Sequence, residues 1–161
     1  MTRLVVVLTL TPLDEGSSFP VENWPLHVTV LPPFLTDAEP GEIAAAIAAA
    51  TSAQPALTAV AGHEEMFGRR KDIPVTVVVP TVGLSLLHDA LIDAVRPFGA
   101  SPDEPAFTGT EFRPHITIKN HARIPEQTTF TLRQIALVDM APRTSSNGRT
   151  VLATIDLPAP H

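Results

Sequence analysis

The 161-residue chain contains no cysteine. That absence excludes disulfide bonds, a thiolate nucleophile and a zinc site with cysteine ligands. No stretch approaches the ~18 consecutive apolar residues of a membrane-spanning helix, so we expect no membrane partner. The apolar run at residues 4–10 has no small-x-small cleavage site behind it and leads into Asp14 and Glu15, which favours a buried strand over a signal peptide. We therefore expect a cytoplasmic protein.

Positive charge is also scarce. The chain has 11 Lys and Arg against 17 Asp and Glu, which gives a formal net charge of −6. This balance disfavours binding to long duplex nucleic acid through a broad basic face, whereas a small anionic ligand needs only a local basic pocket. Arg69, Arg70 and Lys71 form the one basic cluster. The length and the 44% of hydrophobic residues predict one domain over residues 1–161, which we expect to be a monomer.

Two short segments share the pattern histidine, apolar, threonine, apolar: His27-Val28-Thr29-Val30 and His115-Ile116-Thr117-Ile118. Successive side chains of a strand alternate between its faces. Each segment therefore places an imidazole and a hydroxyl on one face and two branched apolar side chains on the other. One copy alone is typical of an ordinary half-exposed strand, but two matched copies among 6 histidines indicate a paired site.

Hydrophobic periodicity predicts an α+β protein in which antiparallel sheets carry helices on their outer sides. Helices are expected at about residues 39–50 and at 84–98. The strand at 26–31 is expected to end at Pro32 and Pro33, which cannot donate to a ladder. Residues 63–71 are predicted to form a polar, mobile connection with an exposed basic tip. The predicted strands span residues 3–11, 26–31, 55–62, 73–79, 112–119, 130–140 and 150–157, with a turn at 145–148.

The two histidine motifs begin comparable halves of the chain, so a pseudo-twofold arrangement would bring the imidazoles to opposite walls of one cleft. Imidazole titrates near neutral pH, and one ring can act as a general base while the other acts as a general acid. Neighbouring threonine hydroxyls can donate hydrogen bonds to a developing oxyanion. These groups suit displacement at phosphorus without a metal. Which histidine is the acid and which the base stays open.

The paired motifs resemble those of the 2H phosphoesterase superfamily, which includes bacterial 2'-5' RNA ligase-like proteins and cyclic nucleotide phosphodiesterases. The resemblance is specific at the first motif and at Arg113-Pro114-His115-Ile116-Thr117-Ile118. It implies a bilobal fold, with two antiparallel sheets and outer helices around a central cleft. It further implies that His27 and His115 are the acid/base pair and that Thr29 and Thr117 bind the phosphate, with no metal or other cofactor.

Further candidates for substrate binding surround the motifs. Many members of the superfamily carry an arginine after the second motif, where this chain has Lys119, which is not an equivalent bidentate donor. Phe67 can stack on a base or plug the core. Arg69 and Arg70 can hold phosphates or form a solvated tip. Phe112 and Arg113 can line the cleft. His63 and His121 can assist or ligate a metal, but the absence of clustered carboxylates at ligand spacing disfavours a metal site, and His88 and His161 are expected to be bystanders.

The leading hypothesis is a metal-independent phosphodiesterase that hydrolyses a cyclic phosphate, or a 2'-5' or 3'-5' linkage, in a small nucleotide or oligonucleotide. Two alternatives stay open. One is a 2'-5' RNA ligase that acts on RNA ends, and the other is a non-catalytic module that binds and sequesters nucleotides.

Overall fold

Ten strands and two α-helices make up the described part of the chain, residues 1–102, 109–119, 122–140 and 148–159 of this computed structural model. The α+β class is confirmed. The helices are α1 (Pro40–Ala50) and α2 (Val82–Val95), and no helix in these ranges is long and apolar enough to cross a membrane. The strands are β1 (Thr2–Thr9), β2 (Ser18–Phe19), β3 (His27–Thr36), β4 (Leu57–Phe67), β5 (Ile73–Val78), β6 (Ser101–Pro102), β7 (His115–Thr117), β8 (Thr129–Leu132), β9 (Gln134–Asp139) and β10 (Arg149–Asp156).

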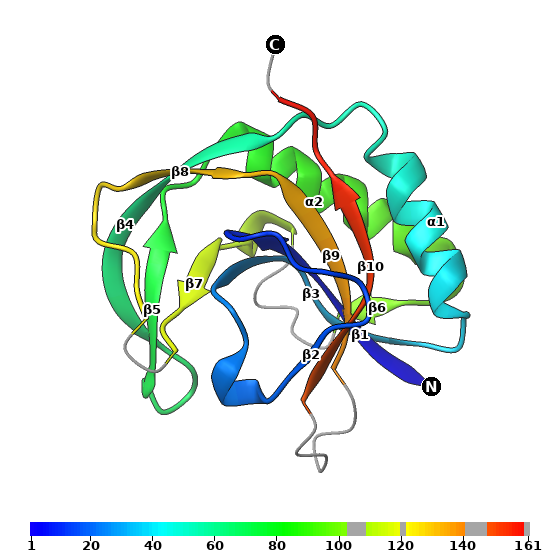
Figure 1. Cartoon of the computed structure of the whole chain (residues 1–161), viewed down its shortest axis with the longest axis horizontal. Coiled ribbons are helices and arrows are strands. Elements are labelled where there is room, and N and C mark those ends of the chain that lie inside the picture. Colours follow the sequence, from blue (N-terminus) through cyan, green and yellow to red (C-terminus); the bar gives the residue numbers. More distant parts are fainter. Residues whose placement is uncertain (103–108, 120–121, 141–147, 160–161) are drawn as a thin grey trace.

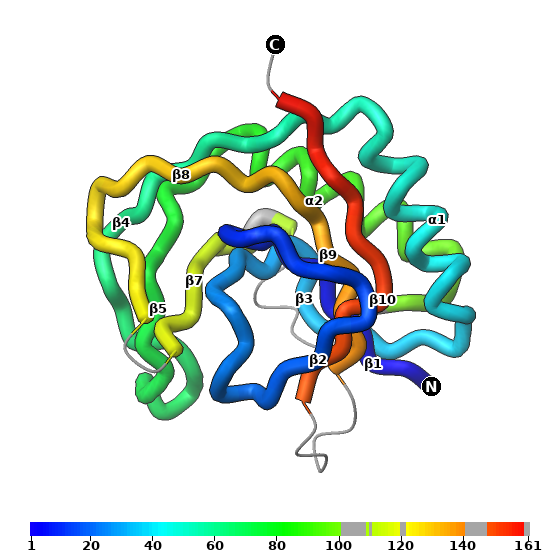
Figure 2. Tube along the Cα trace, viewed as in Figure 1, coloured from blue at the N-terminus to red at the C-terminus, as the bar shows by residue number. Residues whose placement is uncertain are grey.

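The strands follow one curled antiparallel path in the order β2-β10-β9-β1-β3-β7-β5-β4-β8, and β6 pairs with β3 (Figure 1). The two expected sheets are therefore joined, and their seam is the β3–β7 pair. At the far end, β8 leads directly into β9 through Arg133, so the path curls back on itself in the trace of Figure 2. The two histidine strands lie side by side at the middle of this path.

The expectation that Pro32 and Pro33 end the second strand is wrong, because β3 continues to Thr36. The ladder between β1 and β3 pairs Leu4 with Phe34 and Val6 with Leu31, with a register shift between the two pairs. Between these pairs β3 has one residue more than β1, and this β-bulge includes Pro32 and Pro33. Residues in a bulge are locally unpaired, so the ladder tolerates the two prolines, which have no N–H to donate. The strand then resumes its pairing with β1.

Two other boundaries differ from the expectation. Residues 63–67 belong to β4, which pairs with β5 as far as Phe67 and Ile73, so only the turn after Phe67 forms the tip of the hairpin. The strand expected at 112–119 is shorter, because β7 covers only His115–Thr117. Polar residues such as Glu64 and Glu65 concealed the strand character of this part of β4. The turn expected at 145–148 lies mostly outside the described residues.

Both faces of the sheet are buried at its centre. Alternate residues of β1 divide between two apolar clusters: Leu4, Val6 and Leu8 pack with both helices, whereas Val5 and Val7 pack with Trp24 on the opposite face. Figure 1 shows the two helices close together, and α1 and α2 both contribute to the first cluster. We call the side that they cover the helix face and the other side the open face.

A fully buried histidine ties α2 to the neighbourhood of the second motif. His88 Nδ1 lies 2.8 Å from the Val30 carbonyl oxygen, and because a carbonyl only accepts, Nδ1 carries the proton. Its Nε2 accepts the Gly109 N–H at 2.9 Å, and its ring stacks on Phe112 at 4.1 Å. Both ring nitrogens are satisfied, so His88 is a structural residue.

We predict that His88→Leu lowers the free energy of unfolding by about 3 kcal/mol, because the buried Val30 carbonyl and the Gly109 N–H lose their hydrogen-bond partner. Chemical denaturation measures the change. His63→Leu is the matched control, since His63 is exposed on β4, and its effect should stay within about 0.5 kcal/mol. Equal effects of the two substitutions would contradict the structural role of His88.

Candidate active site

The two histidine motifs meet across the seam between β3 and β7. Val28 pairs with Ile116, and both side chains are fully buried on the helix face. Continuing this antiparallel register by one residue in each direction places Thr117 opposite His27 and His115 opposite Thr29. Because side chains alternate along each strand, all four point to the open face. We call these four residues the quartet; in it, each imidazole has the threonine of the other motif as its cross-strand neighbour.

The same hydrogen bond orients both imidazoles. His27 Nδ1 lies 2.8 Å from the carbonyl oxygen of Pro25, and His115 Nδ1 lies 2.8 Å from the carbonyl oxygen of Arg113, in each case two residues earlier in the chain. Since a carbonyl only accepts, Nδ1 is the protonated nitrogen in both rings. Each neutral imidazole therefore carries its lone pair on Nε2, the nitrogen that can take up or deliver a proton.

An aromatic side chain packs against each imidazole. The indole of Trp24 stacks on His27 with ring centroids 3.9 Å apart and an interplanar angle of 27°. Phe67, at the end of β4, meets the ring of His115 edge-on at 4.7 Å. The aromatic contacts bury the imidazoles further and restrict how they can rotate. Trp24 was not among the candidates, although a lone tryptophan three residues before His27 is a signal that sequence reasoning could have used.

The surroundings hold both histidines in the neutral form. Burial lowers the pKa of His27 to about 4, and the positive charges of Lys119 and Arg149 add to the effect. Burial, followed by the charge of Arg113, also lowers the pKa of His115. His27 is only 8% exposed, whereas His115 is partly exposed. Both imidazoles can accept a proton at neutral pH, and a bound anion would favour their protonated forms.

Two cations lie on the Trp24 side of His27. Lys119 follows the second motif, and with Trp24 it lines a pocket of about 250 Å³. The guanidinium of Arg149 lies 5.3 Å from the centre of the Trp24 ring. Arg149 reaches this place because Gly148, with φ 75°, lets β10 begin close to β2; a Cβ there would stand 2.1 Å from the carbonyl oxygen of Phe19. No sequence motif pointed to Arg149.

A different set of side chains lies beside His115. The Arg113 guanidinium forms an ion pair with the Glu65 carboxylate and lies 5.0 Å from the centre of the Phe67 ring. His63 adds a second contact to Glu65, with Nε2 3.3 Å from the carboxylate. The hydrogen bond from Arg113 lowers the pKa of Glu65. Thus Phe67 and Arg113, both expected to bind substrate, do lie next to the quartet.

Other candidates lie elsewhere. Phe112 packs with His88 against the core of the helix face and not against the imidazoles of the quartet. Arg69 and Arg70 are exposed in the turn between β4 and β5, and their role in binding stays a prediction. His121 lies outside the described residues. Within the described ranges, no three His, Asp or Glu side chains are grouped so that they could hold a metal ion.

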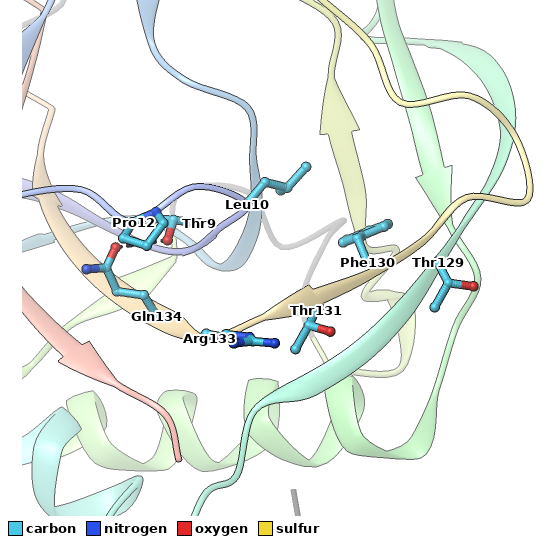
Figure 3. A pocket seen from close by; sticks show the side chains of 8 residues that line it. All are labelled: Thr9, Leu10, Pro12, Thr129, Phe130, Thr131, Arg133 and Gln134. Carbon is cyan, nitrogen blue, oxygen red and sulfur yellow. Dashed lines mark hydrogen bonds between the residues drawn. The ribbon is translucent and has the colours of Figure 1, made fainter. Parts of the chain in front are cut away.

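A second hollow of about 330 Å³ opens where β1 ends and β8 passes into β9 (Figure 3). One of its lining residues, Thr9, pairs with His27 across the β1–β3 ladder. Gln134 stabilises its wall, because its amide accepts from Thr9 Oγ1 at 2.9 Å and exchanges two hydrogen bonds with the backbone of Leu13. Figure 3 shows Arg133 extending toward Thr131 along the other wall.

Comparisons with known proteins bear on the family and the fold of the chain. The family model described as the 2'-5' RNA ligase superfamily matches residues 9–142. Among solved structures, E. coli LigT complexed with NADP+ is 20% identical with a TM-score of 0.61, and each chain is covered to 98%. The TT0787 protein of Thermus thermophilus is 18% identical with a TM-score of 0.61, covering 99% of this chain and 100% of that one. A structure titled as a phosphoesterase is 18% identical, with a TM-score of 0.63 and 98% of each chain covered. A search of curated proteins gave no match.

The neutral state of His27 predicts a loss of stability in acid. The folded pKa lies below the unfolded value of 6.5, so as pH falls from 7 the unfolded chain takes up a proton that the folded chain does not. His27 alone should then reduce the free energy of unfolding by about 2 kcal/mol between pH 7 and pH 5. Urea denaturation at both pH values should show a smaller decrease for His27→Gln than for the wild type. Identical decreases would contradict the burial of a neutral imidazole.

Proposed function

Since the chain belongs to the 2'-5' RNA ligase superfamily, the 2H phosphoesterases, we propose that it is a phosphodiesterase that hydrolyses a small nucleotide or oligonucleotide through two-histidine acid/base catalysis. The observation that supports this proposal is the quartet: two imidazoles and two hydroxyls on one face, with both Nε2 lone pairs defined by backbone hydrogen bonds. The bond that breaks is a phosphodiester, either in a 2',3'-cyclic phosphate or in a 2'-5' or 3'-5' linkage.

In the proposed reaction the phosphate lies over the quartet. The hydroxyls of Thr29 and Thr117 donate hydrogen bonds to its non-bridging oxygens, whose charge increases as water attacks. One neutral imidazole takes the proton of the attacking water at Nε2. The other imidazole, protonated at both nitrogens, gives its Nε2 proton to the leaving ribose oxygen. After the reaction the first imidazole is protonated and the second is neutral, and proton exchange with solvent restores the starting state.

We assign His27 as the general base and His115 as the general acid. His27 is the more deeply buried ring, and the charges of Lys119 and Arg149 disfavour its protonated form. His115 is partly exposed, and the negative charge of a bound phosphate restores the proton that burial disfavours.

The proposed ligands are mononucleotides and short oligonucleotides. E. coli LigT, which shares this fold, has been crystallised with NADP+, 3'-AMP, ATP and phosphate. Phe67 next to His115 offers an aromatic surface on which a base can stack, and Arg113 lies over the same ring. The net charge of −6 favours a small ligand in a local basic site over a long nucleic-acid duplex. We propose the cytoplasm as the compartment. A 2'-5' RNA ligase would use the same quartet in the reverse direction.

We predict that His27→Ala and His115→Ala each lower kcat/KM by about 10²- to 10⁴-fold, because each removes one proton transfer. The assay is hydrolysis of 2',3'-cyclic nucleotides, 2'-5' linked oligoadenylate and cyclic oligonucleotides, followed by chromatography in the presence of EDTA. Arg96→Ala, which removes an exposed cation just after α2, is the control that should keep the wild-type rate. Undiminished hydrolysis in both quartet variants would contradict the proposal, and end joining of RNA without hydrolysis would favour the ligase.

The assignment of acid and base predicts different responses to the leaving group. p-Nitrophenolate leaves without protonation. With a nucleoside 3'-(p-nitrophenyl phosphate) as substrate, the loss of kcat/KM in His115→Ala should therefore be at least about 10-fold smaller than with a ribose leaving group. His27→Ala should show no such recovery, because the water must still be deprotonated. Recovery in His27→Ala instead would reverse the assignment.

A further inference from the structure

Lys119 and Arg149 form a concentration of positive charge that proton transfer does not require. Lys119 is half-buried and sits close enough to Arg149 for the two charges to repel; burial and Arg149 together lower the pKa of Lys119, and the charge of Glu22 opposes them. Within the described ranges neither Lys119 nor Arg149 forms a salt bridge with a carboxylate. A chain with a net charge of −6 thus keeps two such cations beside its candidate site.

The same cluster has more hydrogen-bond donors than acceptors. Arg149 donates from Nη1 to the carbonyl oxygen of Met140 at 2.8 Å, but its buried Nε–H finds no acceptor among the described residues. The buried indole Nε1–H of Trp24 is in the same position. Buried donors without acceptors are rare in folded proteins and call for an explanation. An anionic ligand would offset the positive charge that Lys119 and Arg149 bring together.

The cluster is adjacent to the proposed reaction centre but distinct from it. Trp24 links the two by its contacts: its ring centre is 3.9 Å from that of the His27 imidazole and 5.3 Å from the Arg149 guanidinium carbon. Lys119 extends the cluster, because it lines a pocket with Trp24 and Glu22. A group bonded to the same ribose as the reacting phosphate could therefore reach the cluster while that phosphate stays over the quartet.

We propose that Lys119 and Arg149, with Trp24 between them and His27, bind a second phosphate group of the substrate. The inference rests on the proposed function and narrows its substrate class to nucleotides that carry a second phosphate one ribose away from the reacting one. A 5'-phosphate on a 2',3'-cyclic nucleotide and the next phosphodiester of an oligonucleotide share this chemistry. The forked guanidinium of Arg149 suits a phosphate with several acceptor oxygens.

The test compares two substrates that differ only in the second phosphate: adenosine 2',3'-cyclic phosphate with and without a 5'-phosphate. We expect the 5'-phosphorylated form to have the higher kcat/KM by at least about 10-fold, the worth of one or two charge-assisted hydrogen bonds. In Arg149→Gln and in Lys119→Gln this ratio should fall toward one, and Arg149→Lys should keep part of it. Arg96→Gln, which removes an exposed cation just after α2, is the matched control and should keep the wild-type ratio.

Binding without turnover separates this inference from the proposed function. Calorimetry with 3'-AMP and adenosine 3',5'-bisphosphate should show tighter binding of the bisphosphate by the wild type and no such advantage in Arg149→Gln. That result would support the second site even if no substrate were turned over. Hydrolysis that depends on both histidines but shows no preference for the 5'-phosphate would overturn the second site and leave the proposed function standing. A preference that survives in both Arg149→Gln and Lys119→Gln would overturn it as well.

Discussion

The candidate site depends on one constraint, the alternation of side chains in two neighbouring antiparallel strands. Val28 and Ile116 pair across the β3–β7 seam and are fully buried against the helix face. Their flanking residues must then emerge together on the other face. A shift of one residue in either strand would bury its histidine and threonine and expose its apolar neighbours. The burial of two aliphatic side chains therefore holds four polar ones in place, and β5 secures the short strand β7 on its other side.

The same burial sets the chemistry of the imidazoles. Desolvation lowers the pKa of both rings, and nearby cations lower that of His27 further, so the free protein holds two neutral bases on one face of the sheet. Backbone carbonyls two residues upstream give both rings the same tautomer. In the proposed reaction, a negatively charged phosphate stabilises the proton that one imidazole delivers. In this account the substrate itself helps to prepare the general acid.

Sequence reasoning predicted the face that the four quartet residues share and named Phe67, Arg113 and Lys119 beside them, but it did not name Trp24 or Arg149. The alternation of His27 with Thr29 and of His115 with Thr117 is local, so the face that they share followed from strand geometry alone. Trp24 lies three residues before His27 and so carried a local signal, whereas Arg149 reaches the site from the first residue of β10 through long-range packing that no short motif encodes. Phe112 shows the reverse case, since its position beside the second motif suggested a lining role, whereas its ring packs on His88. Similarly, Pro32 and Pro33 marked an apparent strand end because a bulge cannot be read from one strand alone.

The most direct test of this account is the tautomeric state of the two imidazoles, measured by long-range ¹H–¹⁵N correlation spectra of protein labelled with ¹⁵N-histidine at pH 7. Spectra of His27→Gln and His115→Gln assign the signals. We predict that both rings are neutral and protonated at Nδ1, with a free lone pair on Nε2 of His27, as the hydrogen bonds to Pro25 and Arg113 require. Signals of neutral rings protonated at Nε2, or of charged rings at this pH, would contradict the arrangement on which the proposed proton transfers rest.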